Sequence, residues 1–243
     1  RVIRGRFDGA ALQDVETVFE AAPSKDTAAH YGGRMTFLPD NTLLVAVGDG
    51  FDYREDAQNR ANHYGTIVRV SETGKVPADN PYVDDPAALP EVWSYGHRNP
   101  QSIIYDADTD TVFQTEHGPR GGDELNIIEP AKNYGWPAIT YGIDYTGLRI
   151  SPYTSHEGME QPLEYWDPSF GPSGMTVYRG RLFPAWDGDI FMTSLIFNHV
   201  VRVEMDGRVS GSQQILFGEI GERLRDIRTG LDGDMYICLL YTS

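Results

Sequence analysis

A short unit recurs along this chain and limits its fold more than any other feature: a turn containing Asp, followed by an alternating or apolar run typical of a β-strand. The runs, with second strands that follow some of them, lie at 43–47, 66–70, 111–114, 190–192, 200–204 and 235–237. Asp, Asn and Gly suit such turns because they tolerate left-handed backbone angles. Helix signals are scarce, since 26 Gly and 15 Pro leave few long windows uninterrupted.

Repeated strand pairs of this kind are typical of a sandwich, a barrel or a propeller. The turns are ~40 to 80 residues apart, which favours propeller blades with loop insertions over a sandwich of about 100 residues. The sequence therefore predicts an all-β propeller. Two stretches, 76–90 and 118–168, are dense in residues such as Gly, Pro, Tyr or Asp and are expected to be ordered loops, where binding groups usually lie.

The charge and the apolar content exclude several classes of protein. A net charge of −16 argues against nucleic acid and against an anionic membrane surface, because both need clustered Lys and Arg. No apolar run approaches the roughly 18 residues of a transmembrane helix. The 40% hydrophobic residues suffice for a packed core, and the single cysteine, Cys238, excludes a disulfide framework and a multi-Cys metal site.

One Gly-rich turn followed by acidic residues is a candidate cation site. The segment 116–126 reads Glu-His-Gly-Pro-Arg-Gly-Gly-Asp-Glu-Leu-Asn. Its glycines and proline hold backbone carbonyls in an exposed turn, and Ca²⁺ binds about six to eight oxygens, from carbonyls as readily as from carboxylates. A Gly-rich turn with solvated acids is the alternative, and the segment alone leaves both open.

Two clusters of basic and amide residues are candidates for binding an anion. Arg98, Asn99 and Gln101 offer a guanidinium fork and two amides near an expected strand start. Arg223 and Arg225 are two residues apart on another strand, so their side chains are expected on one face. In a chain this acidic, these arginines could simply neutralise nearby carboxylates, or they could hold a ligand that carries several carboxylates.

A histidine and an aspartate suggest acid–base chemistry. His30 lies in Gly-rich turn sequence, and Asp49 follows at the end of the next expected strand. A His oriented by a carboxylate can serve as a general base, although a lone His beside Gly is more often a capped turn residue. The aromatic residues Tyr134, Trp136 and Trp166 are either core residues or a stacking wall for a flat ligand.

In this order, the motifs resemble the soluble quinoprotein glucose/sorbosone dehydrogenase family, and within it the aldose sugar dehydrogenase branch. The resemblance runs from about Arg1 to Ile237. It is carried by His-x-Gly-Gly-Arg, Gly-Asp, Val-Pro-x-Asp-Asn-Pro, Gly-His-Arg-Asn-Pro-Gln, the 116–126 block, Asn-Tyr-Gly-Trp-Pro, Pro-Ser-Gly-Met and Arg-x-Arg-Asp. The 116–126 and 98–101 blocks are the specific ones.

The resemblance implies a six-bladed β-propeller that binds pyrroloquinoline quinone (PQQ) and Ca²⁺ and oxidises aldoses at C1 to lactones, in the periplasm or outside the cell, with an external electron acceptor. His30 would remove the C1 hydroxyl proton as hydride passes to the quinone, and Asp49 would orient the imidazole. The residues that would contact PQQ are Arg98, Asn99, Gln101, Arg223 and Arg225.

The resemblance also implies metal and sugar contacts. The carbonyls of Gly118 and Pro119 would ligate the Ca²⁺ that polarises the quinone oxygens. Glu124, with the carbonyl of Tyr134, would belong to a second, structural Ca²⁺ site. Trp166 would line the sugar entrance.

Two other interpretations remain open at this point: a calcium-dependent lactonase-like propeller, and a non-catalytic propeller that binds glycans or proteins. A lactonase would bind its metal mainly through side chains and would not need several Arg residues aimed at one ligand. Ile196 stands where glucose-specific members of the family carry a Lys, which favours a broad range of sugars.

The landmarks account for about four of the family's six blades. We therefore expect an incomplete propeller, a partial domain over residues 1–237 of a chain that is a fragment lacking its signal peptide and closing strands. The last six residues, 238–243, match the translation of a transposon-type sequencing adapter and are predicted to be a non-native tail.

Overall fold

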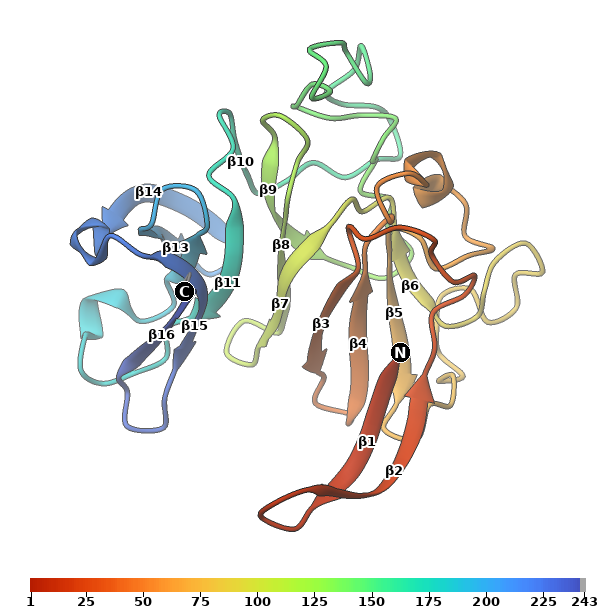
Figure 1. Cartoon of the computed structure of the whole chain (residues 1–243), viewed down its shortest axis with the longest axis horizontal. Coiled ribbons are helices and arrows are strands. Elements are labelled where there is room, and N and C mark those ends of the chain that lie inside the picture. The colour runs from red at the N-terminus through yellow and green to blue at the C-terminus, as the bar shows by residue number, and fades with distance from the viewer. Residues whose placement is uncertain (241–243) are drawn as a thin grey trace.

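The computed structural model describes residues 1–240, which form an all-β fold of sixteen strands, β1 to β16. The strands make three four-stranded and two two-stranded antiparallel sheets, and three short 3₁₀ helices lie in the connections: η1 (Arg54–Gln58), η2 (Pro184–Trp186) and η3 (Gly218–Ile220). Figure 1 shows the sheets side by side around an arc, as the blades of a propeller are. The predicted all-β propeller is confirmed, and it is incomplete, with strands for about four blades.

Each four-stranded blade is built from strands that are consecutive in the chain. The first contains β3 (Gly32–Phe37), β4 (Thr42–Val47), β5 (Thr66–Ser71) and β6 (Val92–Tyr95). The second contains β7 (Pro100–Asp106), β8 (Thr111–Glu116), β9 (Asp123–Ile128) and β10 (Glu164–Trp166). The third contains β11 (Pro172–Val177), β12 (Ile190–Ser194), β13 (Val200–Asp206) and β14 (Val209–Leu216).

The two-stranded sheets flank these blades. One is the hairpin of β1 (Val2–Phe7) and β2 (Leu12–Phe19), and the other pairs β15 (Arg223–Thr229) with β16 (Met235–Leu240). Strand β16 includes the first three residues of the predicted tail, and the rest of that tail lies outside the described residues. Within residues 1–240, no helix is both long and apolar enough to cross a membrane.

The Asp-containing turns do form the hairpins, and one of them shows why. Asn41 adopts a left-handed φ of 63° between β3 and β4. Asp40 Oδ1 accepts hydrogen bonds from the backbone N–H of Thr42 at 2.9 Å and from its hydroxyl at 2.6 Å. An Asx side chain thereby satisfies the turn's backbone and fixes where β4 begins.

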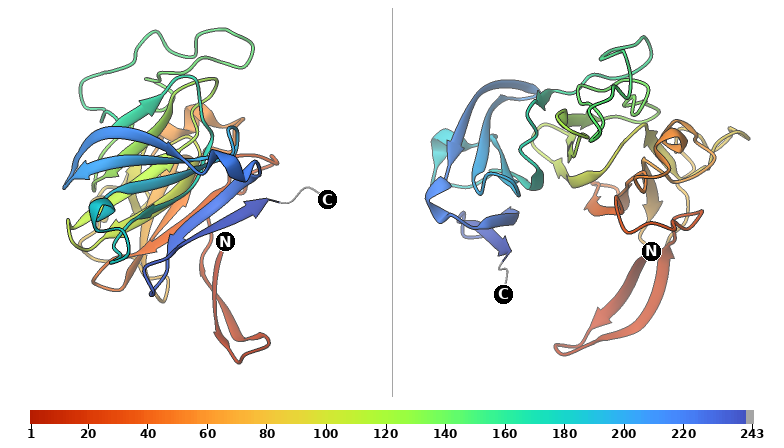
Figure 2. Two further views of the ribbon diagram at one scale, coloured as in Figure 1. Left: turned by 90° about the vertical axis from the view of Figure 1, so that its left-hand side faces the viewer. Right: turned by 45° about the horizontal axis from the view of Figure 1, so that its top comes forward.

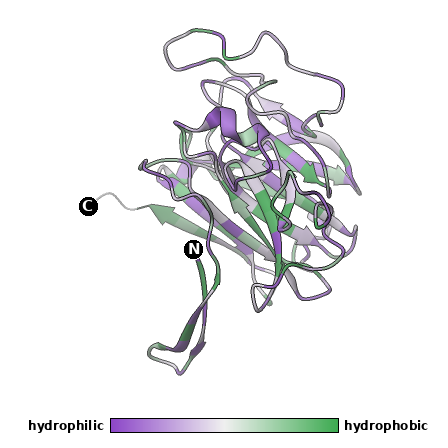
Figure 3. Cartoon of the chain, turned by 90° about the vertical axis from the view of Figure 1, so that its right-hand side faces the viewer, coloured by the Kyte–Doolittle hydropathy of each residue, from purple (hydrophilic) through white to green (hydrophobic). Residues whose placement is uncertain are grey.

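The core lies between the faces of neighbouring sheets. The first strands of successive blades lie against each other, since β7 contacts both β3 and β11, and β11 contacts β15 (Figure 2). Leu44 and Ile67 of the first blade pack with Ile103 of the second, and Leu125 of the second packs with Met192 of the third. The hydropathy colouring of Figure 3 accordingly places much of the hydrophobic sequence on the strands.

One expectation about the loops is corrected. The stretch 118–168 is not a continuous loop, because it contains β9 and β10. Fully buried Leu125 and nearly buried Ile128 anchor β9 in the core, and the alternation around them is a strand signal that the high density of Gly and Pro on either side obscured. The true loop is the segment between β9 and β10.

Candidate functional site

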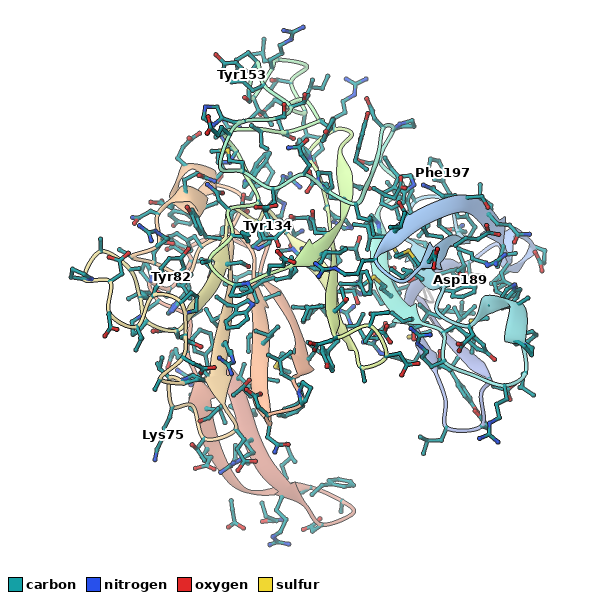
Figure 4. The ribbon with its side chains drawn as sticks, turned by 180° about the vertical axis from the view of Figure 1, so that it is seen from behind. Lys75, Tyr82, Tyr134, Tyr153, Asp189 and Phe197 are labelled. Carbon is teal, nitrogen blue, oxygen red and sulfur yellow. The ribbon has the colours of Figure 1, made fainter. Side chains whose placement is uncertain are left out.

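The antiparallel register brings the candidate residues to one end of the propeller. Gly32 pairs with Val47, Pro100 with Glu116, and Pro172 with Ser194. The start of the first strand in each blade therefore lies beside the end of the second strand. Chain that precedes β3 or β7 and chain that follows β4 or β8 meet at this end, below the loop whose Tyr153 is labelled in Figure 4.

His30 and Asp49 form a close pair at this end. His30 Nδ1 lies 2.7 Å from Asp49 Oδ1, and the Asp49 carboxylate is fully buried. The same Oδ1 accepts the backbone N–H of Phe51 at 2.8 Å, while Oδ2 accepts Trp136 Nε1–H at 2.8 Å. Because both carboxylate oxygens accept, His30 presents Nδ1–H to Asp49, and its Nε2 is left as the acceptor nitrogen.

The backbone around this pair depends on special conformations. His30 has a left-handed φ of 53°, which a non-glycine residue adopts only at a cost. A Cβ on Gly48 would lie 2.3 Å from the His30 carbonyl oxygen, so only glycine allows the two segments to pass this closely. The Gly-rich sequence that surrounds His30 and Asp49 is therefore what brings them together.

A pocket of about 270 Å³ opens in front of the histidine. Its lining residues are His30, Asp49, Phe51, Asp52, Arg54, Arg98, Pro119, Trp136, Asp144, Tyr145 and Ile150. This volume is near the lower end of the ~300–1,000 Å³ typical of small-molecule sites. The wall is polar, with carboxylates and guanidiniums that can hydrogen-bond a polyhydroxylated ligand.

Arg98 is a buried residue of this pocket's wall, and a buried carboxylate holds its backbone. Glu116 Oε2 accepts the backbone N–H of Arg98 at 2.6 Å and that of Asn99 at 3.2 Å. The Arg98 guanidinium lies 5.2 Å from the Trp136 ring and donates from Nη1 to the carbonyl of Gly118 at 2.5 Å. Arg98 Nε is buried and has no partner among the described residues, so this guanidinium keeps a donor that a ligand could use.

Hydrogen bonds connect the histidine end of the site to the arginine on β15. The backbone N–H of Asp49 donates to the Arg98 carbonyl at 2.8 Å, and Gln101 Nε2 donates to Asn99 Oδ1 at 3.1 Å. Gln101 Oε1 then accepts from Arg225 Nη1 at 3.4 Å. The structure thus gathers these predicted residues although more than 120 positions separate Gln101 from Arg225.

Arg223 and Arg225 do not have the same partners. A register irregularity lies between Leu224 and Asp226, so the simple alternation from which we expected a shared face is interrupted here. Arg223 is exposed and donates to the Leu195 carbonyl at 3.2 Å. Arg225 is partly buried, and this burial lowers its pKa, with the positive charge of Arg34 as a second cause.

The proposed calcium ligands lie next to this cluster. Gly118 and Pro119 are buried, and Pro119 lines the pocket. A Cβ on Gly118 would meet the carbonyl oxygens of Gly121 and Gly122 at 2.3 and 2.2 Å, so the turn folds tightly enough to concentrate carbonyl oxygens. Such a donor set suits a hard cation.

A second place for a cation lies one layer deeper. Glu116 of β8 and Glu124 of β9 are direct cross-strand partners, an arrangement in which like charges repel. Desolvation raises the pKa of Glu124 to about 8, with Glu116 as the next cause. Both line a cavity of about 10 Å³, together with Gly118 and Tyr134. That is about the room that one water or ion requires.

Side chains alone do not make a metal site in the described chain. Within residues 1–240, no three His, Cys, Asp or Glu side chains come together in metal-binding geometry. Any cation here would depend on backbone carbonyls with one or two carboxylates. The donor set is compatible with Ca²⁺.

Trp166 lies apart from the pocket. It is on β10, its Nε1–H donates to Gln213 Oε1 of β14 at 2.9 Å, and its ring contacts Phe170 edge-on. With Phe197 and Ile215 it lines a separate groove between the second and third blades. Its predicted place at the sugar entrance stays a prediction.

Several pocket residues were not identified from the sequence. Arg54 of η1 and Asp144 of the β9–β10 loop approach within 3.3 Å at the pocket. Tyr145 stacks on Phe51, with ring centroids 6.3 Å apart. For Asp144 and Tyr145, the one available signal was their place in the long insertion between β9 and β10. Trp136, in contrast, belongs to the Asn-Tyr-Gly-Trp-Pro motif.

Comparisons with known proteins place the chain in a family. The family model described as Glucose / Sorbosone dehydrogenase matches residues 1–240. The aldose sugar dehydrogenase YliI of Escherichia coli is 38% identical over 233 residues, which cover 95% of this chain and 62% of that protein.

Solved structures are similar as well. A crystal structure of a glucose dehydrogenase has a TM-score of 0.93 at 40% identity, and covers 97% of this chain and 68% of its own. The PQQ-bound aldose sugar dehydrogenase of Streptomyces coelicolor has a TM-score of 0.70 at 29% identity, with coverage of 89% and 57% respectively. The chain spans about 60% of the length of the curated relatives that it matches most fully.

Proposed function

The chain belongs to the glucose/sorbosone dehydrogenase family, and we propose that it carries the active site of a PQQ- and Ca²⁺-dependent aldose sugar dehydrogenase, which oxidises an aldose at C1 to the lactone. The observation that carries this proposal is the pair of His30 and Asp49 on the wall of a polar pocket, 2.7 Å apart, beside the buried guanidinium of Arg98.

His30 has the geometry of a general base. Asp49 fixes the imidazole with Nδ1–H toward the carboxylate, so Nε2 accepts the proton of the C1 hydroxyl. As that O–H bond breaks, the C1–H bond releases a hydride with its electron pair, and C1=O forms. Asp49 then stabilises the imidazolium, and Trp136 holds Asp49 in place from its other oxygen.

When bound, PQQ supplies the hydride acceptor and Ca²⁺ supplies a Lewis acid beside it. PQQ is a flat tricarboxylate, and the orphan Nε of Arg98 and the partly buried Arg225 are suited to its negative charges. Asn99 and Gln101 lie between them and offer amide donors, and Arg223 would complete the set from the same strand as Arg225.

The two cation sites would use different donors. The carbonyls of Gly118 and Pro119 would hold the Ca²⁺ next to the pocket. Glu124 and the carbonyl of Tyr134 would hold the second, structural Ca²⁺, in the small cavity where Glu124 faces Glu116. A cation there would remove the like-charge repulsion of the two carboxylates.

The sugar would occupy the pocket in front of His30. Asp52, Arg54 and Asp144 line it and can pair with vicinal hydroxyls, while Tyr145 offers a ring face. A wall built from several polar groups of both charges fits a broad range of aldoses. We also propose a periplasmic or secreted location and an external electron acceptor, both by extension from the family.

The test is dye-linked oxidation of a panel of aldoses by the full-length protein reconstituted with PQQ and Ca²⁺. We expect activity in the unchanged protein and its loss, by ~10²-fold or more in kcat, in His30→Asn. His156→Asn is the matched control, because His156 is exposed and its imidazole hydrogen-bonds the carbonyl of the adjacent residue, away from the pocket lining. Near-normal oxidation by His30→Asn would refute the role of His30, and lactone hydrolysis without PQQ would favour the lactonase alternative.

A further inference from the structure

Lys25 lies beneath the His30–Asp49 pair, in the segment that connects β2 and β3. Its Nζ donates to the carbonyl oxygen of His30 at 3.0 Å and also to the carbonyl oxygen of Gly48. One acceptor belongs to His30 itself, and the other to the residue immediately before Asp49. A single ammonium therefore joins the two backbone segments that present the pair.

These two segments need a bond of this kind. His30 has a strained left-handed φ of 53°, and the Gly48 backbone passes so close that no Cβ would fit. Two carbonyl oxygens directed at one point repel each other, and a cation with several donors between them replaces that repulsion with two charge-assisted hydrogen bonds. Within residues 1–240, the backbone contributes one further hydrogen bond to the His30 carbonyl, from Gly50 N–H at 3.2 Å.

The surroundings of Lys25 hold its side chain in this position. The rings of Tyr31 and Tyr64 face the ammonium at 5.5 and 5.7 Å, and the Asp49 carboxylate adds attraction. The segment is itself fixed, because Tyr64 Oη donates to the Ser24 carbonyl at 3.3 Å. Burial disfavours the charged form and lowers the pKa of Lys25 to about 8, so a lysine here costs free energy that an exposed lysine would not.

We propose that Lys25 is a positioning residue for the proposed active site: its ammonium ties the His30 and Gly48 carbonyls together and so fixes the distance and angle between the His30 imidazole and the Asp49 carboxylate. It touches neither substrate nor cofactor in this role. The proposal rests on the proposed function only for its effect on rate, since the geometry of the pair can be measured without sugar or cofactor.

The test compares Lys25→Met with Lys75→Met in the full-length protein. Lys75 is an exposed turn residue after β5, far from the Tyr153 loop in Figure 4, and its substitution removes the same charge. For Lys25→Met with PQQ and Ca²⁺ we expect kcat to fall roughly 10- to 100-fold with KM changed less than about 3-fold, because a small misplacement of reacting groups is enough to cost that much. Lys75→Met should keep both constants.

A second measurement reports directly on the hydrogen bond between His30 and Asp49. In cofactor-free protein labelled with ¹⁵N-histidine, the His30 Nδ1–H bonded to Asp49 should give a strongly downfield proton signal, assigned by its loss in His30→Asn. We expect Lys25→Met to shift or broaden this signal, and Lys25→Arg, which keeps a cation with several donors, to preserve it and at least a tenth of the wild-type kcat.

The outcomes separate the two proposals. Wild-type kcat and an unchanged His30 signal in Lys25→Met would overturn the positioning role while leaving the proposed function intact. No sugar oxidation by the unchanged protein would refute the proposed function, and the His30 signal would still decide the role of Lys25. If Lys25→Met does not fold, a folded Lys25→Arg that has lost the His30 signal would overturn the proposal.

Discussion

Replacing Asp49 with Asn tests the site's electrostatics with a change of very few atoms. The carboxylate is fully buried, and its nearer oxygen lies 2.7 Å from His30 Nδ1. Two unit charges about 4 Å apart attract by ~4 kcal/mol at an effective dielectric constant of about 20. If this attraction stabilises the imidazolium that forms in the transition state, its loss corresponds to a fall of ~10³-fold in kcat, with little change in KM.

The hydrogen bonds also predict how the new amide of Asp49→Asn would be oriented. In the unchanged protein, Oδ1 accepts from both His30 and the Phe51 N–H, whereas Oδ2 accepts from Trp136 alone among the described residues. An amide has one carbonyl oxygen, so that oxygen takes the position with two donors and the NH₂ faces the indole N–H. Two donors then oppose each other in a buried place, which costs ~1–3 kcal/mol of stability, while the His30 tautomer is preserved.

A double substitution separates these two effects. Trp136→Phe removes the indole N–H that opposes the new amide. In the Trp136→Phe background, Asp49→Asn should therefore cost much less unfolding free energy than it does in the wild type. The loss of kcat caused by Asp49→Asn should be the same in both backgrounds. Thermal unfolding and steady-state oxidation of an aldose by the reconstituted protein supply the two readouts. A fall in kcat of less than ~10-fold in Asp49→Asn, or recovery of kcat in the double variant, would refute the reasoning.

Three other outcomes can be measured with single substitutions. Removal of Ca²⁺ by a chelator should lower Tm by several degrees, since a ligand at about 100 times its Kd contributes ~2.7 kcal/mol. Glu124→Gln should lose this dependence. It should also be more stable than the wild type without metal, because burial raises the pKa of Glu124 to about 8 and the wild type must therefore protonate this carboxylate on folding, whereas Gln need not. An equal Tm loss in both proteins would contradict the second cation site. Arg54→Ala should raise KM for aldoses by ~10-fold and change kcat by less than ~3-fold, because Arg54 lines the pocket but does not touch the reacting atoms. A fall in kcat with unchanged KM would contradict a contact between Arg54 and the sugar. Burial keeps the pKa of Lys25 at about 8 in the folded protein, below the ~10.5 of an unfolded chain, so the free energy of unfolding should rise as pH increases from about 8 to 10.5. Urea unfolding should show this rise in the wild type and not in Lys25→Met. The same dependence of unfolding free energy on pH in both proteins would contradict the burial of Lys25.

Much of the fold follows from local sequence, because hairpins are local. Asp40 and Asn41 specify a turn and the apolar run after them specifies a buried strand, so the propeller could be predicted without any long-range information. Strand β9 was hidden because Gly121 and Gly122 stand directly before it and suggest a loop. Those glycines serve the turn at Gly118, and the strand begins immediately after them.

The candidate site was predictable only as far as its motifs extend. His30 with Asp49 and Arg98 with Asn99 stand in compact motifs, and the structure places them at one end of the blades. Lys25 is outside every motif, since its contacts are with backbone carbonyls, which carry no sequence signal. The bulge at Arg225 was equally invisible, because alternation along a strand assumes an uninterrupted register.

At the end of the propeller where the first strand of each blade begins, a chain of net charge −16 brings several guanidiniums close together. Arg98 precedes β7, Arg34 lies on β3 and Arg225 on β15, so each guanidinium comes from a different blade. Arg34 spans 192 residues of sequence to pair with Asp226 at 2.9 Å and also donates to the Ser173 carbonyl at 3.2 Å. It is thereby neutralised in part, yet its charge still lowers the pKa of Arg225. Like charges brought together by separate blades cost free energy in the protein alone, and an anion with several carboxylates would offset that cost. The blade geometry therefore brings three guanidiniums together where the strands begin, beside a pocket whose wall also carries Asp52 and Asp144.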